Sequence, residues 1–445
     1  MVSLRSGTVP HSPFHESGRF GRIFPYLPVY ENSDQFLTKL GKQGGLMDEG
    51  FEDDTAAEST TITAGFTFFG QFIDHDITFD TTSSLERQND PTAIRNFRTP
   101  ILELDSVYGM GPEASPYLYD KNNLGKLLIG NDKNPHDLPR NSQEIALIGD
   151  PRNDENLIIS QLHLAFIKFH NRVVDEVKAR GFLGEAVFPE AQRLVRWHYQ
   201  WIVLNEYLPL IVGQAVVDDI LNNGRKFFSW QKQPFIPVEF SVAAFRLGHT
   251  QVRNRFRVND RPESEKQLFE LRVSGAVPPA QVVDWKKFFQ FDSCQPPQFS
   301  KKLDAKIASV LLDLPVPIVG EDDPRRSLAI RNLFRGKSFS LPSGQAVAKA
   351  MGIKPLSDEQ LGLKELGYKE EVPLWFYILK EGEVQTGGET LGEVGGRLVA
   401  EVLIGLLEGD FMSYLKIDPC WVPCLPSTKP GEFKMADLLN LAAVC

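Results

Sequence analysis

The chain of 445 residues is long enough to bury a large hydrophobic core, and 42% of its residues are hydrophobic. Its formal net charge of -10 at pH 7 argues against nucleic acid or an anionic membrane surface as a partner. No Pro- or Ser-rich linker and no block of charge divides the sequence. We therefore predict one large domain at residues 20–445, preceded by a flexible N-terminal arm at residues 1–19.

The cysteines and the ends of the chain give little sign of export or of a disulfide framework. Four cysteines are too few for such a framework, and the spacing of Cys420 and Cys424 fits no common metal motif. We expect buried free thiols, and a local disulfide between these two stays open. The N-terminus lacks an apolar stretch of signal-peptide length, and no apolar run reaches the length of a membrane span. These features predict a cytoplasmic protein or one secreted without a leader.

Residues 63–80 (TAGFTFFGQFIDHDITFD) form the first strongly predicted helix. Gln71 and His75 are four residues apart, so they share one face of that helix. Asp74 and Asp76 lie about 100° to either side of His75. The helix thus directs an imidazole and an amide toward one target and two carboxylates toward others. Taken alone, a His beside an Asp is more often structural.

Residues 98–111 (RTPILELDSVYGMG) are predicted to form an extended loop. Thr99, Ile101, Glu103 and Asp105 alternate in it, and a period of two puts alternate residues on one side of an extended strand. That side presents a hydroxyl, a backbone carbonyl and two carboxylates, which are the hard oxygen ligands that Ca²⁺ prefers. A solvent-facing acidic edge is the alternative interpretation.

The segment 149–155 (GDPRNDE) reads as a turn that begins a helix, because Pro151 is favoured at such a position. Arg152 and Glu155 are three residues apart and would share a face of a helical turn. A local ion pair at the surface is the alternative to a functional pair.

Apolar residues on helical spacing predict long core helices at residues 157–180, 189–212 and 392–409. Three further histidines lie in the first two of these helices, and we interpret them as structural: His163, His170 and His198.

Two later segments each contain two polar residues three positions apart, which is close to one turn of a helix. Residues 240–252 (FSVAAFRLGHTQV) place His249 three residues after Arg246, and the small Gly248 would let a flat ring approach closely. Residues 330–336 (IRNLFRG) place Asn332 and Arg335 one helical step apart.

Five motifs in this order, GQFIDHD, TPILELDSVYG, GDPRNDE, AFRLGHT and IRNLFRG, resemble those of the animal-type haem peroxidases in the peroxidase–cyclooxygenase superfamily. The resemblance covers about residues 20–439, nearly the whole chain, and is to the short, bacterial-type members. It implies a mainly α, single-domain fold with few strands and with haem between central helices.

The resemblance implies that His75 is the distal histidine of a peroxidase, with Gln71 holding water or an anion nearby and Arg152 stabilising charge. Such an enzyme reduces H₂O₂ and oxidises halide, thiocyanate or aromatic donors through a ferryl intermediate. His75 would shuttle a proton between the peroxide oxygens, which suits an imidazole. Asn156 stands where one mammalian member has a methionine bonded to haem. We therefore expect bromide, iodide, thiocyanate or aromatic donors rather than chloride.

On the proximal side the resemblance implies that His249 binds the iron of haem b through Nε2. Asn332 would accept the hydrogen bond from its Nδ1, because a ligating histidine normally donates its other N–H. Arg246 and Arg335 would each pair with one haem propionate, which suits the planar guanidinium.

The resemblance also implies two covalent links and one metal ion. Asp74 and Glu155 would form esters to opposite edges of the haem. One Ca²⁺ would clamp the helix that carries His75, and its ligands would be Asp76, Thr99, Ile101, Glu103 and Asp105.

Two alternatives stay open at this point. A fatty-acid dioxygenase of the same superfamily would need a tyrosine three residues before the proximal histidine, where this chain has Arg246. A catalytically inactive, adhesive peroxidase-like protein is the other, and the expected site residues argue against it.

Overall fold

The computed structural model describes residues 18–444, apart from 51–54, 81, 82, 84, 86, 87, 132, 274, 293, 294, 321–324, 369 and 370. The predicted N-terminal arm falls outside the described residues except for its last two positions, which belong to a strand. Cys294 and Cys445 also lie outside them. Cys420 and Cys424 are free and exposed, so the expectation of buried thiols is wrong for these two.

The protein is mainly helical, as predicted, with 48% helix and 8% strand. The α-helices are α1 (Asp34–Gly41), α2 (Ala64–Ile77), α3 (Asp105–Tyr108), α4 (Leu157–Ala179), α5 (Val187–Ile202), α6 (Leu208–Val212), α7 (Gln214–Asn223), α8 (Val316–Val319), α9 (Leu328–Ser338), α10 (Gly344–Ala350), α11 (Leu363–Leu366), α12 (Leu374–Thr386), α13 (Glu393–Gly409), α14 (Tyr414–Ile417) and α15 (Met435–Leu441). No helix in the described part of the chain is both long and apolar enough to cross a membrane.

The strands are short. They are β1 (Gly18–Gly21), β2 (Glu58–Thr63), β3 (Arg95–Asn96), β4 (Ile236–Pro237), β5 (Arg255–Arg257), β6 (Glu265–Gln267) and β7 (Phe299–Lys301). The strand β1 pairs antiparallel with β3 and parallel with β4, while β2 pairs with β7 and β5 with β6. The β2–β7 pair leads directly into α2, so it fixes where that helix begins.

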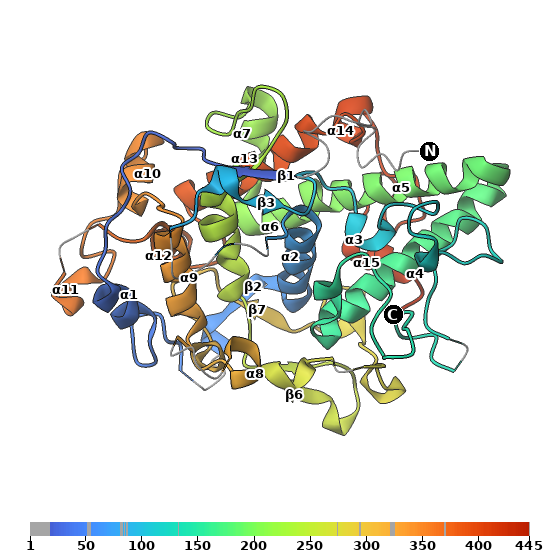
Figure 1. The fold of residues 1–445 in the computed structure, drawn as a ribbon, viewed down its shortest axis with the longest axis horizontal. Coiled ribbons are helices and arrows are strands. Elements are labelled where there is room, and N and C mark those ends of the chain that lie inside the picture. Colours follow the sequence, from blue (N-terminus) through green and yellow to red (C-terminus); the bar gives the residue numbers. More distant parts are fainter. Residues whose placement is uncertain are drawn as a thin grey trace.

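Helix α2 lies in the middle of the molecule, with α4 and α5 to its right and α9 and α12 to its left in Figure 1. It is apolar on nearly all sides, which is the pattern of a fully buried helix. Phe72 stacks on Phe166 of α4 with ring centroids 4.5 Å apart, and the ring of Tyr199 in α5 meets both edge-on. This aromatic packing holds α2 at a defined depth in the core.

The predicted helices at 157–180 and 392–409 are confirmed as α4 and α13. The one predicted at 189–212 begins two residues earlier and is interrupted by a π-helical turn, η6 (Val203–Tyr207), between α5 and α6. Turns of this kind insert an extra residue and re-aim a side chain. Here the hydroxyl of Tyr207 approaches Gly70 so closely that a Cβ there would lie 2.5 Å from it.

The segment predicted as a helix at 240–252 is less regular than expected. It consists of a π-helical turn, η7 (Glu239–Ala243), followed by a 3₁₀ segment, η8 (Ala244–His249). Both pack against α12 and α13, and η8 also contacts α2. This packing brings His249 close to the helix that carries His75.

The extended loop predicted at 98–111 is wrong in its second half. Asp105 begins the short helix α3, and Leu104 before it adopts a left-handed conformation with φ of 60°. Residues 101–108 are all buried rather than alternating between two faces. The period of two in the sequence therefore does not correspond to a strand, because the chain turns at Leu104.

Candidate active site

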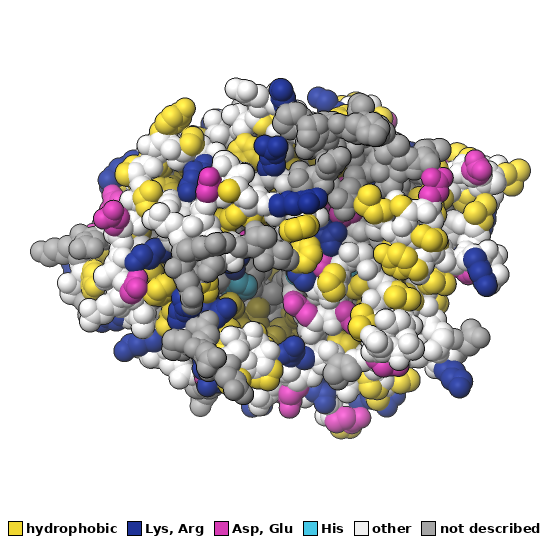
Figure 2. All heavy atoms as spheres, viewed as in Figure 1, with side chains coloured by type: hydrophobic (Ala, Val, Ile, Leu, Met, Phe, Trp, Pro, Cys, Tyr) yellow, Lys and Arg dark blue, Asp and Glu magenta, His cyan; other side chains and the backbone are white. Residues whose placement is uncertain are grey.

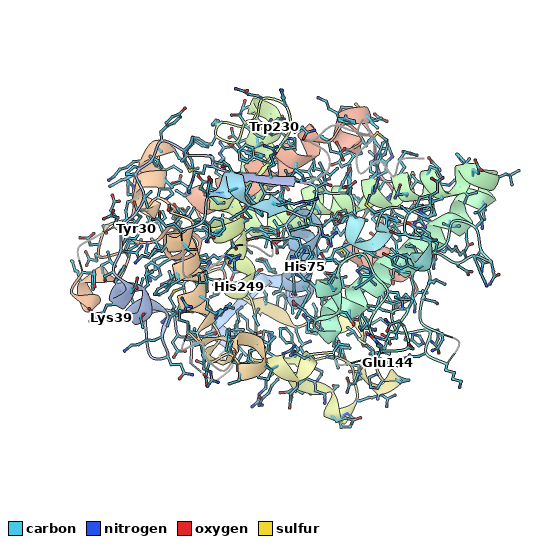
Figure 3. All side chains as sticks on the ribbon, viewed as in Figure 1. Tyr30, Lys39, His75, Glu144, Trp230 and His249 are labelled. Carbon is cyan, nitrogen blue, oxygen red and sulfur yellow. The ribbon has the colours of Figure 1, made fainter. Side chains whose placement is uncertain are left out.

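A cavity of about 660 Å³ lies between α2, η4 (Pro151–Asp154), η8 and α9. Its volume is in the range of cofactor and ligand sites. Figure 2 shows a hollow near the centre of one face where a histidine is visible, and Figure 3 places His75 and His249 near the middle of the molecule. Eight of the predicted site residues line this cavity: Gln71, Asp74, His75, Arg152, Glu155, Arg246, His249 and Arg335.

His75 is held by an amide that the sequence analysis did not single out. The imidazole is 5% exposed, and its Nδ1 lies 2.7 Å from Oδ1 of Asn153 in η4. Burial, and next the positive charge of Arg152, lower the pKa of His75 to about 4. The ring is therefore neutral near pH 7, and Nε2 makes no hydrogen bond to any residue that the structure describes.

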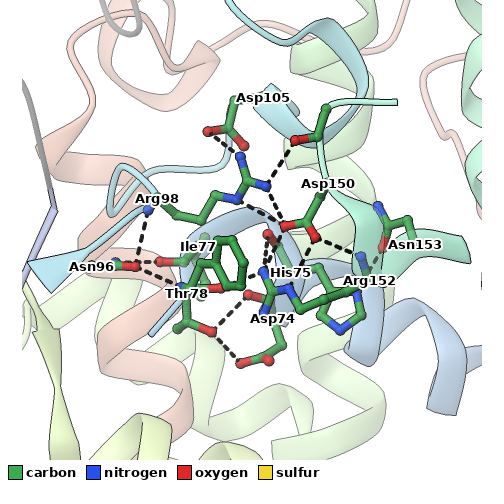
Figure 4. A network of polar contacts seen from close by, with 12 residues as sticks. Asp74, His75, Ile77, Thr78, Asn96, Arg98, Asp105, Asp150, Arg152 and Asn153 are labelled. Carbon is green, nitrogen blue, oxygen red and sulfur yellow. Dashed lines mark hydrogen bonds and ion pairs between the residues drawn. The ribbon is translucent and has the colours of Figure 1, made fainter. Parts of the chain in front are cut away.

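Arg152 is held by hydrogen bonds at the C-terminal end of helix α2 (Figure 4). Its Nη2 donates to the backbone oxygens of His75 at 3.0 Å and Thr78 at 2.6 Å, and its guanidinium also pairs with Asp150 at 2.8 Å. Although burial opposes it, hydrogen bonds from Arg152 and the charges of Arg152 and Arg98 lower the pKa of Asp150 to about 2. Asp150 stays ionised and fixes Arg152 beside His75.

The same network continues to the loop that precedes α3. Arg98 donates from Nε to Asp150 at 3.0 Å and from Nη1 to Asp105 at 3.2 Å. Arg98 and Asp105 are both buried. The predicted metal-binding loop and the predicted distal arginine are thus joined through one guanidinium and one carboxylate.

The two predicted ester residues line the cavity and make other contacts in this structure. Gln71 donates from Nε2 to Oε1 of Glu155 in a short hydrogen bond. The amide of Gln71 is therefore bonded to the carboxyl group of Glu155. Burial raises the pKa of Glu155. Oδ1 of Asp74 accepts a hydrogen bond from the hydroxyl of Thr78 at 2.9 Å.

On the opposite side of the cavity, Asn332 contacts His249 as predicted, but with the other end of its amide. Nδ2 of Asn332 lies 2.7 Å from Nδ1 of His249, and Oδ1 of Asn332 accepts from Nη1 of Arg246 at 3.0 Å. The expectation that Asn332 accepts a hydrogen bond from His249 is therefore wrong for this structure. A guanidinium can only donate, so Arg246 turns the amide oxygen toward itself.

Arg246 and Arg335 place two partly buried positive charges on the cavity. Burial, and next the charge of Arg335, lower the pKa of Arg246 to about 10. Nε of each arginine is buried and has no hydrogen-bond partner among the described residues. The nearest carboxylate to Arg335 is Asp80, at 3.4 Å. Two partly buried cations with unused Nε donors fit an anionic ligand, and together with His249 they fit a haem with its two carboxylates.

The three acidic residues among the predicted calcium ligands lie near one another, and two of them face arginines. Asp76 is completely buried, and burial followed by the charge of Asp105 raises its pKa. The backbone N–H of Leu104 and the hydroxyl of Tyr199 lie near its carboxyl group, but without the geometry of a full hydrogen bond. Asp105 pairs with Arg98, and Glu103 lies 3.6 Å from Arg196. No group of three or more His, Cys, Asp or Glu among the described residues is arranged to hold a metal ion.

Of the three histidines interpreted as structural, one is part of the site. His170 bonds to the hydroxyl of Tyr108 at 3.0 Å and to a backbone oxygen, and His198 bonds to the oxygen of Leu194 at 2.7 Å. His163, however, lies 3.0 Å from Nδ2 of Asn153, the residue that holds His75. Only the position of Asn153 beside Arg152 in the GDPRNDE motif could have indicated this.

Comparison with known proteins assigns the family. The animal haem peroxidase family model matches residues 82–362, more than half of the sequence. The chain belongs to the animal haem peroxidase family. Among curated relatives it is 24% identical to the chorion peroxidase of Aedes aegypti over 65% of this chain and 37% of that protein. It is 32% identical to the myeloperoxidase of Mus musculus over 26% of this chain and 16% of that protein.

The chain spans well under half the length of those two relatives. Among solved structures it resembles peroxidase A of Dictyostelium discoideum, with a TM-score of 0.63, 15% identity, and 90% of this chain and 89% of that chain covered. A fatty acid α-dioxygenase of Oryza sativa has a TM-score of 0.62 at 16% identity, covering 89% of this chain and 76% of that chain. At such identities the likeness shows a shared fold alone.

Proposed function

We propose that this protein is a haem-dependent peroxidase, with His249 as the iron ligand and His75 as the group that moves protons on H₂O₂. The observation that carries the proposal is the position of both imidazoles on one cavity that also contains two partly buried arginines, each with a buried Nε that has no partner among the described residues. The family supports haem as the cofactor. When bound, haem would supply the electron transfer that reduces peroxide.

The protein side of the reaction would be acid–base chemistry at His75. The imidazole of His75 is neutral at pH 7, so its free Nε2 can take a proton from one oxygen of H₂O₂. It can then return that proton to the other oxygen, which leaves as water. Arg152 would stabilise the negative charge that builds on the departing oxygen, using a donor that is not committed to Asp150 or to the helix backbone.

Iron binding at His249 would require the Asn332 amide to turn over. A ligating Nε2 carries no proton, so Nδ1 must carry it and needs an acceptor. Asn332 can accept only with its oxygen, which Arg246 holds in the present arrangement. Turning the amide would release Arg246 to pair with a haem carboxylate, so the two events would be coupled.

We further propose bromide, iodide, thiocyanate or aromatic compounds as the donors, and ester links from Asp74 and Glu155 to the haem. Asn156 supports the absence of a third covalent link, because an amide cannot form a sulfonium bond. Ca²⁺ near Asp76 completes the proposed cofactor set, and its support is a fully buried carboxyl group that lies near Asp105 and Glu103.

The fatty-acid dioxygenase reading has less support. Arg246 occupies the position three residues before His249 where that activity would need a tyrosine. In this structure Arg246 donates a hydrogen bond to Asn332, on the side of the cavity where His249 lies.

The test is reconstitution of the full chain with haem, followed by steady-state assays of H₂O₂ consumption with each halide, thiocyanate and a phenolic donor. We expect a Soret band and turnover with at least one donor. His249→Ala should lose the haem, and His75→Gln should keep it while slowing the peroxide step by about 10²–10⁴-fold. The exposed His136 provides the control, since His136→Gln should behave as wild type. Full peroxide reactivity in His75→Gln would contradict the assignment.

A further inference from the structure

A chain of hydrogen bonds runs from His75 away from the cavity into the core. Oδ1 of Asn153 lies 2.7 Å from Nδ1 of His75, and Nδ2 of Asn153 lies 3.0 Å from Nδ1 of His163. His75 belongs to α2, Asn153 to η4 and His163 to α4, and all three side chains are buried. Helix α2 therefore meets η4 and the neighbouring α4, both distant from it in sequence, at one amide.

The chemistry of the amide decides where the protons are. An amide nitrogen only donates and an amide oxygen only accepts. Nδ1 of His163 must therefore accept, which leaves the proton of the neutral His163 ring on Nε2. Nδ1 of His75 must donate, which leaves Nε2 of His75 without a proton. This is the tautomer that a base facing the cavity requires.

The surroundings hold this arrangement in place. The ring of His163 meets Phe72 of α2 edge-on, with centroids 6.1 Å apart, and Nε2 of His163 is buried with no partner among the described residues. The backbone N–H of Asn153 donates to the oxygen of Asp150 at 3.1 Å, which fixes the turn that presents the amide. His163 is neutral, since burial lowers its pKa to about 3.

We propose that Asn153 is a positioning residue, oriented by His163, that fixes His75 in the tautomer with an unprotonated Nε2 facing the cavity. The inference rests on the proposed function of His75 and adds two residues to it. Neither Asn153 nor His163 touches the reacting atoms. Their effect is to keep one of the two neutral forms of His75 populated.

The tautomer can be read directly in the haem-free, full-length chain labelled with ¹⁵N-histidine. Long-range ¹H–¹⁵N correlation spectra distinguish the protonated from the unprotonated ring nitrogen, and the signals missing in His75→Gln assign His75. We expect the His75 proton on Nδ1 in the wild type and a mixture of tautomers in Asn153→Ala. A proton found on Nε2 in the wild type would overturn the proposal.

A matched pair at position 163 separates orientation from packing. His163→Asn keeps an acceptor near the place of Nδ1, whereas His163→Leu fills the apolar site without one. We expect His163→Asn to retain the Nδ1-protonated form of His75 and His163→Leu to lose it. A merely structural role would favour the apolar leucine, and equal spectra for the two variants would contradict the proposal.

Stopped-flow reaction of the haem-loaded enzyme with H₂O₂, normalised to haem content, completes the test. We expect Asn153→Ala and His163→Leu to slow this step on the order of tenfold or more, with partial rescue in His163→Asn. If His75→Gln is slow and Asn153→Ala is not, the present inference fails while the proposed function stands. If His75→Gln is not slow, the proposed function fails instead.

Discussion

Arg246 donates a hydrogen bond from Nη1 to Oδ1 of Asn332 at 3.0 Å, and this contact turns the amide nitrogen of Asn332 toward His249. The corresponding contact of His75 is with the oxygen of Asn153. The two cavity histidines thus meet opposite ends of two asparagine amides. In the proposed function, His75 is already oriented as a base, while His249 would become an iron ligand only after the Asn332 amide had turned.

The first prediction concerns the partner of His249. Asn332→Asp offers only acceptors to Nδ1, so it should strengthen the iron ligand and lower the Fe(III)/Fe(II) potential of the haem-loaded protein. Asn332→Leu offers none and should raise that potential while keeping the haem. Redox titration measures both. Potentials that do not differ between the two variants would remove Asn332 from the proximal role.

The second prediction concerns pH. Burial lowers the pKa of His170 and of His198 to about 4 in the folded protein, below the ordinary value of about 6.5. Between these values the unfolded chain binds more protons than the folded one, so stability rises with pH there. Their contribution to stability should therefore fall as the pH drops from about 6.5 to about 4, whereas Glu206, Asp304 and Glu381, whose pKa burial raises to about 7, act in the opposite direction.

Calorimetry across this range tests the pH dependence. His198→Gln should be less stable at pH 7 but should show a shallower fall on acidification, because one of the groups that titrate has been removed. The same slope of melting temperature against pH in His198→Gln and in the wild type would contradict the argument.

The third prediction concerns calcium. A bound cation would offset the buried charge of Asp76 and of its neighbour Asp105, so chelation should lower the melting temperature. It should also slow the peroxide step, because Asp76 adjoins His75. Asp76→Asn should lose the metal. Elemental analysis of active, haem-loaded protein decides the matter, and full activity without calcium would rule the site out.

The fourth prediction concerns the covalent links. Asp74 and Glu155 both line the cavity, so we expect ester bonds to form during turnover with H₂O₂. After peroxide treatment, acidified acetone should extract little haem from the wild type. Asp74→Val and Glu155→Gln should each leave one link, and the double variant none. Mass spectrometry of the separated haem would show unmodified haem throughout if the links do not form.

The hydrogen bond from Gln71 to Glu155 should make the ester at Glu155 harder to form than the ester at Asp74. Gln71→Ala would free the carboxylate of Glu155, so it should raise the fraction of haem linked at this position per turnover. The same mass spectra measure that fraction, and a lower yield in Gln71→Ala would mean that Gln71 orients Glu155 for the link.

Local spacing in the sequence was enough to predict much of this protein. Helix α2 with Gln71 and His75 on one face, the turn that begins at Pro151, and the long helices α4 and α13 depend on contacts between near neighbours. Hydrophobic periodicity records such contacts directly. The order of the five motifs also predicted the family, because that order is a property of the sequence itself.

The tertiary structure alone decided which atoms meet. The alternation at Thr99, Ile101, Glu103 and Asp105 suggested a strand, but the turn at Leu104 buries this stretch and brings Asp105 to Arg98. The choice between the two ends of an amide depends on competing partners far away in the sequence. Asn332 is 86 residues from Arg246, and Asn153 is 78 residues from His75. Residue spacing records no such competition, because hydrogen-bond polarity is settled only when all donors and acceptors are in place.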